Sequence, residues 1–117
     1  MAVEWVRPNA GEITEHGSQG VFMTELARYE TAGRYRTYVT EVAPGGVLGR
    51  HGGRADGFQL FYVLTGAGWV SGSDGVKHDI GVGQAVLWSG GESHESGSEI
   101  GMTVVMVMSD SRPSTLL

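Results

Sequence analysis

The stretch PGGVLGRHGGRADGFQLFYVLTGAGW, residues 44–69, decides the fold. It begins with a Pro-Gly-Gly turn and contains an apolar run, residues 58–64, that a Thr-Gly pair closes. Because glycine and proline mark turns, the pattern predicts two strands joined by a glycine-rich bend. Each strand carries a side chain that can bind a metal ion, His51 on the first and Gln59 on the second.

Glycine is the unusual component of the whole chain. It supplies 20 of the 117 residues, against an ordinary share of about 7%. The glycines fall in pairs between short apolar segments, which indicates many tight turns between short strands. No stretch keeps a 3.6-residue apolar period long enough for a helix. The sequence therefore predicts one all-β domain, residues 1–117, built as a barrel or sandwich.

The expected strands follow from β-branched and aromatic runs between turn residues. They cover residues 3–7, 21–28, 34–43, 47–51, 58–64, 69–71, 76–80, 85–88 and 102–108. Residues 12–20 are polar and are expected to form a loop with His16 at the surface. Residues 109–117 are expected to form a loose tail.

Composition excludes several classes of function. Cysteine is absent, so disulfides, thiolate metal sites and cysteine nucleophiles are excluded. The net charge is −5 with only eight Lys and Arg, which provides no basic stripe for nucleic acid or an anionic membrane. No apolar run reaches the roughly 20 residues that span a bilayer, and the first residues do not resemble a signal peptide. We expect a soluble cytoplasmic protein.

Two expected strands, residues 58–64 and 102–108, are apolar on both faces. A strand that is covered on one side only alternates with polar residues, so the second face of each must also be covered. Since no helix is available, we expect a homodimer. The alternative is a sandwich in which two sheets and the N-terminal segment bury both faces within one chain.

Side-chain alternation brings candidate ligands together. Gln59 and Phe61 share one face of their strand, because residues two apart point the same way. His94 begins a returning segment after the loop at residues 89–92. Nitrogen and oxygen ligands that converge from adjacent strands can hold a divalent metal ion, because strands fix ligand directions well.

These residues resemble two motifs of the cupin superfamily. The first motif reads Gly-x4-His51-x-Gly53-x5-Gln59, followed by an apolar run that ends in glycine. The second reads Gly-x5-Ser89-x-Gly-x2-His94. The resemblance covers residues 44–97, about half of the chain. It implies a β jelly-roll barrel with an internal pocket, frequent dimerisation, and metal-ligand positions at both histidines.

The chain departs from the family pattern at three positions. Gly53 stands where the family has a second histidine, Gln59 where it has glutamate, and Ser89 where it has proline. The remaining set, His51, Gln59 and His94, carries no negative charge and should bind a divalent ion weakly. One outcome is a weakly held Fe, Mn, Zn or Ni ion with open positions. The other is a metal-free pocket in which the two histidines serve as acid or base.

Nearby side chains extend the candidate site. Glu92, Glu95 or Asp56 could supply the missing carboxylate, although a residue of this kind is more often a solvated loop charge. The alternation of residues before the first motif points Arg36 and Tyr38 inward, where Arg36 would clamp a carboxylate or phosphate. Phe61 and Trp88 would line the pocket with aromatic surface. Solvent exposure of Arg36 and simple core packing of the aromatic residues are the alternatives.

Three functions remain open. The first is a metabolic enzyme that acts on a small organic substrate with the metal at His51, Gln59 and His94. By resemblance its chemistry is oxygen insertion, isomerisation, cyclisation or decarboxylation. The second is a metal-free enzyme in which His51 or His94 is the general base. The third is a noncatalytic module that binds a small ligand, since a fold does not dictate activity.

Overall fold

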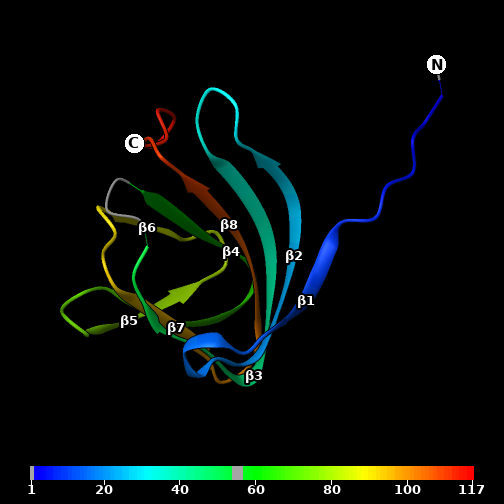
Figure 1. Cartoon of the computed structure of the whole chain (residues 1–117). Coiled ribbons are helices and arrows are strands. Elements are labelled where there is room, and N and C mark those ends of the chain that lie inside the picture. The colour runs from blue at the N-terminus through cyan, green and yellow to red at the C-terminus, as the bar shows by residue number, and fades with distance from the viewer. Residues whose placement is uncertain (1, 54–56) are drawn as a thin grey trace.

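The computed structural model describes residues 2–53 and 57–117. Its regular elements are strands with one short 3₁₀ turn, η1, between the first two (Figure 1). In order they are β1 (Asn9–Ile13), η1 (Glu15–Gly17), β2 (Gln19–Tyr29), β3 (Tyr35–His51), β4 (Phe58–Ser71), β5 (Lys77–Gly81), β6 (Ala85–Ser89), β7 (His94–Ser98) and β8 (Met102–Ser109).

The strands form one antiparallel sheet that closes on itself. Along the main path the strand order is β1-β2-β3-β7-β4-β5. β8 pairs with β3 and β4, the two strands that flank β7, so the ring β3-β7-β4-β8 is complete. This closed arrangement confirms the predicted all-β jelly-roll barrel.

β3 and β4 are longer than the sequence predicts. Strand ends were expected at the Pro-Gly-Gly turn after residue 43 and at the Thr-Gly pair after residue 64, but β3 and β4 run through these points. Gly45 and Gly66 have φ angles of 80° and 77°, a region that favours glycine. At Gly66 a side chain would also collide with the backbone of Gly101. Each glycine therefore bends a strand and lets it continue.

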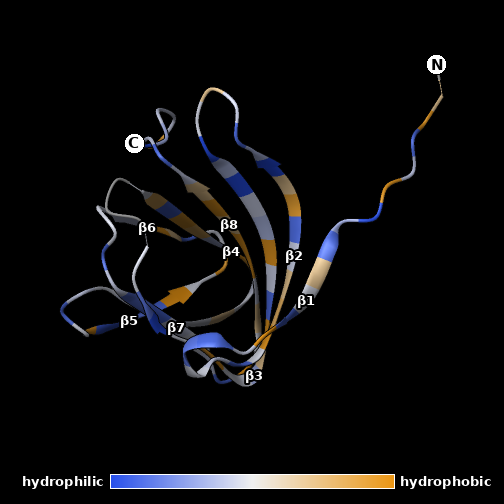
Figure 2. Cartoon of the chain, in the orientation of Figure 1, coloured by the Kyte–Doolittle hydropathy of each residue, from blue (hydrophilic) through white to orange (hydrophobic). Residues whose placement is uncertain are grey.

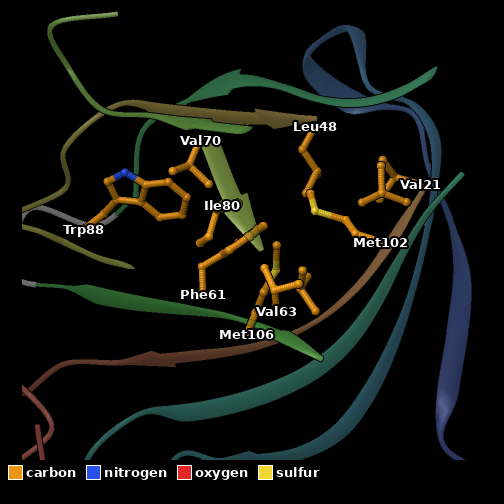
Figure 3. Packing of buried hydrophobic residues seen from close by; sticks show 11 residues of the cluster. Val21, Leu48, Phe61, Val63, Val70, Ile80, Trp88, Met102 and Met106 are labelled. Carbon is orange, nitrogen blue, oxygen red and sulfur yellow. The ribbon is translucent and has the colours of Figure 1, made fainter. Parts of the chain in front are cut away.

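The core fills the inside of this barrel. Val21, Phe61, Val63 and Val104 are fully or almost fully buried, and they alternate with more exposed neighbours along their strands. Figure 3 shows Val21, Phe61 and Val63 packed with Met102 and Met106, with Trp88 at one end of the cluster. Beyond that end the barrel is open, and the candidate site lies there.

The N-terminal segment differs from the prediction. Residues 3–7 form no strand and leave the barrel as an extended arm (Figure 1). Residues 12–20 are not a simple loop, because they hold the end of β1, η1 and the start of β2. After β8 the tail is tied at its start, where the backbone N–H of Arg34 donates to Asp110 at 3.0 Å. Within the described residues, none of the helical structure is long and apolar enough to cross a membrane.

Candidate functional site

The two predicted histidines lie side by side at the open end of the barrel. His51 ends β3 and His94 begins β7, and the two residues are partners in register across these strands. Their ring centroids are 4.5 Å apart with an interplanar angle of 64°. The closure of the barrel by β7 therefore brings together two imidazoles that are distant in sequence.

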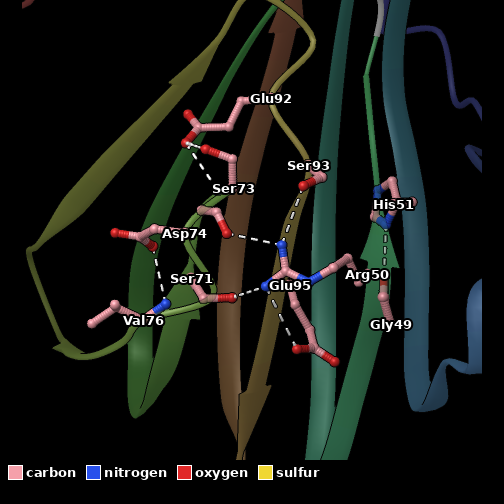
Figure 4. A network of polar contacts seen from close by, with 11 residues as sticks. Gly49, Arg50, His51, Ser71, Ser73, Asp74, Val76, Glu92, Ser93 and Glu95 are labelled. Carbon is pink, nitrogen blue, oxygen red and sulfur yellow. Dashed lines mark hydrogen bonds and ion pairs between the residues drawn. The ribbon is translucent and has the colours of Figure 1, made fainter.

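Backbone carbonyls fix the orientation of both rings. His51 Nδ1 lies 2.7 Å from the carbonyl oxygen of Gly49, and His94 Nδ1 lies 2.9 Å from that of Glu92. A carbonyl only accepts, so each Nδ1 is the protonated donor and each Nε2 carries the lone pair. Figure 4 shows the contact between His51 and Gly49. Carbonyl-bound Nδ1 is the arrangement usual for metal-binding histidine.

His94 is the most enclosed polar group of the site. The residue is only 4% exposed, and its Nε2 atom has no hydrogen-bond partner among the described residues. Its ring stacks on Trp88 at 4.3 Å between centroids. Burial lowers the pKa of His94, although the hydrogen bond to Glu92 opposes this shift. A neutral imidazole therefore presents an unpaired lone pair, which is costly to leave without a partner.

Arg50 holds the strand ends that carry the two histidines. Its guanidinium donates to the Ser71 hydroxyl at 2.7 Å and to the Gly72 carbonyl at 2.8 Å. A longer bond of 3.3 Å reaches the Ser93 hydroxyl, next to His94 (Figure 4). Because Arg50 also precedes His51 in the chain, one side chain ties β3, β4 and the start of β7 together.

A cavity of about 240 Å³ opens beside the two imidazoles. Gln59 lines it from β4 and is nearly buried. Its amide nitrogen donates a long bond of 3.9 Å to the Met106 sulfur, so the amide oxygen is the atom of Gln59 that could accept from or bind a ligand. Apart from His51, Gln59 and His94, the main side chains of the lining are Arg34, Arg36, Phe58, Trp88, Met108 and Asp110.

Two of the expected pocket residues lie elsewhere. Arg36 and Trp88 line the cavity, whereas Phe61 and Tyr38 do not. Phe61 is fully buried behind Trp88, with ring centroids 5.6 Å apart, so it supports the cavity wall from the core. Tyr38 packs against the core cluster. Burial and the neighbouring Glu25 carboxylate raise the pKa of Tyr38, and Arg36 opposes this shift.

Two of the candidate carboxylates, Glu92 and Glu95, have polar partners other than the histidines, although Glu92 also lines the cavity. Glu92 accepts hydrogen bonds from both the backbone N–H and the hydroxyl of Ser73, each at 3.1 Å (Figure 4). Glu95 faces Arg50 at 3.9 Å. Asp56 lies outside the described residues. In residues 2–53 and 57–117, no group of three or more His, Cys, Asp or Glu side chains is placed to hold a metal ion.

His16 was expected at the surface and has a contact that the sequence does not reveal. Although exposed, its ring stacks on His51 with centroids 5.0 Å apart and an interplanar angle of 16°. Its φ of 59° is unusual for a residue other than glycine. The turn that carries it sits directly on β3, where any side chain at Gly49 would collide with the His16 carbonyl. No motif signalled this stack, nor the cavity positions of Arg34 and Met108.

The site fits a weakly bound divalent metal ion. Two imidazoles whose Nδ1 atoms bond to backbone carbonyls, together with one amide oxygen, form a neutral donor set. The unpartnered Nε2 of His94 is the feature that such an ion would satisfy. Since no carboxylate joins the set among the described residues, the site should bind metal less tightly than one with an anionic ligand.

Comparison with known proteins identifies the fold. No family model and no curated protein matches the sequence. A predicted oxalate decarboxylase of Thermotoga maritima superposes with a TM-score of 0.76 at 23% identity, over 93% of this chain and 98% of that one. The polyketide cyclase RemF of Streptomyces resistomycificus superposes with a TM-score of 0.72 at 22% identity, over 99% of this chain and 87% of that one.

A third structure carries the family name. The Cupin_2 domain of a transcriptional regulator of the XRE family from Enterobacter cloacae superposes with a TM-score of 0.71 at 15% identity, over 80% of this chain and all of that one. The fold and site thus define an antiparallel jelly-roll barrel with a histidine pair at its open end. The chain has the cupin fold, as the resemblance of residues 44–97 implied.

Proposed function

We propose that the chain is a small-molecule enzyme of the cupin type. Its cavity would take a small organic substrate beside a weakly held divalent metal ion, bound by His51, Gln59 and His94. The observation that carries the proposal is the buried, unpartnered Nε2 of His94, which lies beside a second imidazole in the same tautomer. Structural neighbours described as a decarboxylase and a cyclase support this class of activity.

Different residues around the cavity would have different roles in such an enzyme. When bound, a divalent ion would polarise a carbonyl or enolate oxygen of the substrate. Gly49 and Glu92 hold the two imidazoles in the tautomer that keeps Nε2 free. Trp88 and Met108 give the cavity an apolar wall that excludes water. Arg36, at the cavity lining, would orient an anionic group of the substrate.

A metal-free enzyme is the second candidate. Burial lowers the pKa of His94, so its Nε2 is unprotonated near neutral pH, and the residue lines the cavity. In that state the atom is suited to act as a general base on a substrate that the cavity orients. Gln59 would then donate or accept a hydrogen bond instead of binding metal.

Metal content tests the proposal. We would dialyse the purified protein against Fe, Mn, Zn and Ni salts in turn and measure bound metal by elemental analysis. The proposal expects close to one ion per chain for at least one of these metals. His51→Ala and His94→Ala should each abolish binding, because each removes one of only two imidazole ligands.

His78 supplies the matched control. It is an exposed histidine on β5 that does not line the cavity. His78→Ala should therefore bind metal as the unchanged protein does. Equal metal content in all four proteins would place the ion elsewhere and refute the metal proposal. A protein that binds no metal under any condition would leave the acid/base candidate.

A further inference from the structure

A row of side chains crosses four strands at the open end of the barrel. Arg36 of β3 pairs in register with Met108 of β8, and Met108 pairs with Gln59 of β4. Gln59 in turn pairs with Trp88 of β6. All four residues line the cavity, as expected for register partners, which share one face of a sheet. Arg36 therefore lies in the same layer of side chains as the candidate ligand Gln59, with β8 between them.

An apolar wall separates Arg36 from the other polar groups of the cavity. Neighbouring strands are about 4.8 Å apart, so the backbones of Arg36 and Gln59 are separated by roughly 10 Å. Met108 occupies the interval, and the ring of His94 stacks on Trp88 at the far end of the row. Figure 2 shows hydrophobic colouring along β8 and hydrophilic colouring at the first end of β3. A ligand that reaches from Arg36 to the histidines must therefore pass along apolar surface.

Arg36 has only a loose partner within the chain. Its guanidinium lies 3.9 Å from the carboxylate of Glu30, and the two side chains are 38% and 60% exposed. Ion pairs of this length and exposure contribute little. The neighbouring Arg28 binds Glu25 closely, at 2.8 Å. A carboxylate in the cavity could instead meet Arg36 in two parallel hydrogen bonds of about 2.7–2.9 Å, which is a much stronger contact.

The size and charge of the cavity restrict the ligand further. Its volume of about 240 Å³ is below the roughly 300–1,000 Å³ that ligand cavities usually have. Two carboxylates also line it, but Glu92 accepts from Ser73, and Asp110 accepts from the backbone N–H of Arg34. Because the net charge of the chain is −5, the attraction for an anion must come from nearby cations.

We propose that the substrate is a small monocarboxylate with an apolar body of about one ring. This inference rests on the proposed function. Arg36 binds the carboxylate, the apolar body lies along Met108 and Phe58, and the other end of the molecule reaches His51 and His94. A neutral analogue forfeits the charge-assisted hydrogen bonds, and an acid without an apolar body leaves the wall in water. Arg36 is thus the residue that selects the charge of the substrate.

Calorimetric titration with benzoate tests the proposal. Benzamide has the same shape without the charge, and acetate has the charge without the ring. The full chain is first dialysed against a chelator, so that binding does not depend on a metal ion. Benzoate should bind at least roughly tenfold more tightly than either analogue, because it alone gains both the ion pair and the buried ring.

Substitutions of Arg36 assign the charge selection to this residue. Arg36→Gln should lower the affinity for benzoate at least roughly tenfold and leave the affinity for benzamide unchanged. Arg36→Lys keeps the charge but not the planar pair of donors, so it should restore only part of the affinity. Arg112→Gln removes an exposed arginine that does not line the cavity, and it should bind benzoate as the unchanged chain does.

The outcomes separate the substrate from the metal centre. Absence of benzoate binding, equal affinity for benzoate and benzamide, or undiminished benzoate binding by Arg36→Gln would overturn the proposed substrate class. A chain that binds benzoate through Arg36 but takes up no metal would support the substrate class and contradict only the metal site. A chain that takes up metal at the histidines but does not distinguish benzoate from benzamide would do the reverse.

Discussion

His51 and His94 are paired across β3 and β7 with their ring centroids 4.5 Å apart. Both rings donate from Nδ1 to a backbone carbonyl, so the neutral form of each ring has its lone pair on Nε2. Neither feature depends on a bound ion. The closure of the barrel thus brings two imidazoles with the same Nδ1 arrangement into contact.

Gln59→Glu should tighten metal binding. The substitution keeps the length of the side chain and replaces a neutral amide oxygen with a carboxylate at a nearly buried position in the cavity lining. Added ligand charge raises affinity for divalent ions, and we expect a gain of roughly tenfold or more. Competition against a coloured chelator would measure it. Gln84→Glu, at an exposed turn residue, is the control, and an equal gain there would contradict ligation by Gln59.

Gly53→His should add a third imidazole. A side chain at Gly53 has open space, with the nearest atom, the Cα of Gly91, 4.0 Å from the position of its Cβ. Gly53 also lines the cavity. We expect metal affinity to rise roughly tenfold or more, because three nitrogen ligands replace two. Gly11→His, at another unstrained and open position, should not change the affinity measured by calorimetry.

His16 should act as a positioning residue for His51. His16→Ala removes the stacked ring and should lower metal affinity by roughly threefold to tenfold. This factor corresponds to the stabilisation of about 0.5–1.5 kcal/mol that an aromatic pair provides. His16→Phe should restore most of the loss, since it keeps an aromatic ring at the same positive φ. Calorimetric titration of both variants would decide. If His16→Phe did not restore the metal affinity, the loss in His16→Ala would not come from the aromatic stack.

The stability of the metal-free protein should depend on pH through His94. Burial lowers its pKa in the folded state below the ordinary value of about 6.5. As the pH falls through about 6.5, the unfolded chain takes up a proton that the folded chain does not, so the free energy of unfolding decreases. Denaturation curves between about pH 7.5 and 5.5 should show this decrease. The slope should be smaller in His94→Gln, and identical slopes would contradict the assignment.

Local signals in the sequence predict an all-β fold, and the resemblance of residues 44–97 to the cupin motifs predicts the jelly-roll barrel and the histidine pair. Glycines mark the turns around residues 58–64, and side-chain parity puts Gln59 on the same face as Phe61, which is the buried face. The strand limits are less predictable. In the sequence, Gly45 and Gly66 have the appearance of strand ends. In the structure each glycine only bends its strand, and the strand continues after it. Whether a strand ends at a glycine depends on its pairing with distant strands, which local composition does not predict.

Contacts between distant segments also explain what the sequence missed. The stack of His16 on His51 exists because η1 approaches β3 closely at Gly49. Phe61 obeys the predicted alternation, yet Trp88 stands between it and the cavity. Alternation gives the face of a strand but not the depth of a residue below the opening. That depth depends on the size of the side chains stacked above it.

The most direct test of the account is anomalous diffraction from crystals grown with zinc or manganese. We predict one strong peak at the open end of the barrel, in contact with Nε2 of both His51 and His94 and with the amide oxygen of Gln59. For zinc the distance to each nitrogen should be about 2.0–2.1 Å. Diffraction that shows both imidazoles bound only to water, or a peak outside the cavity, would contradict the metal site.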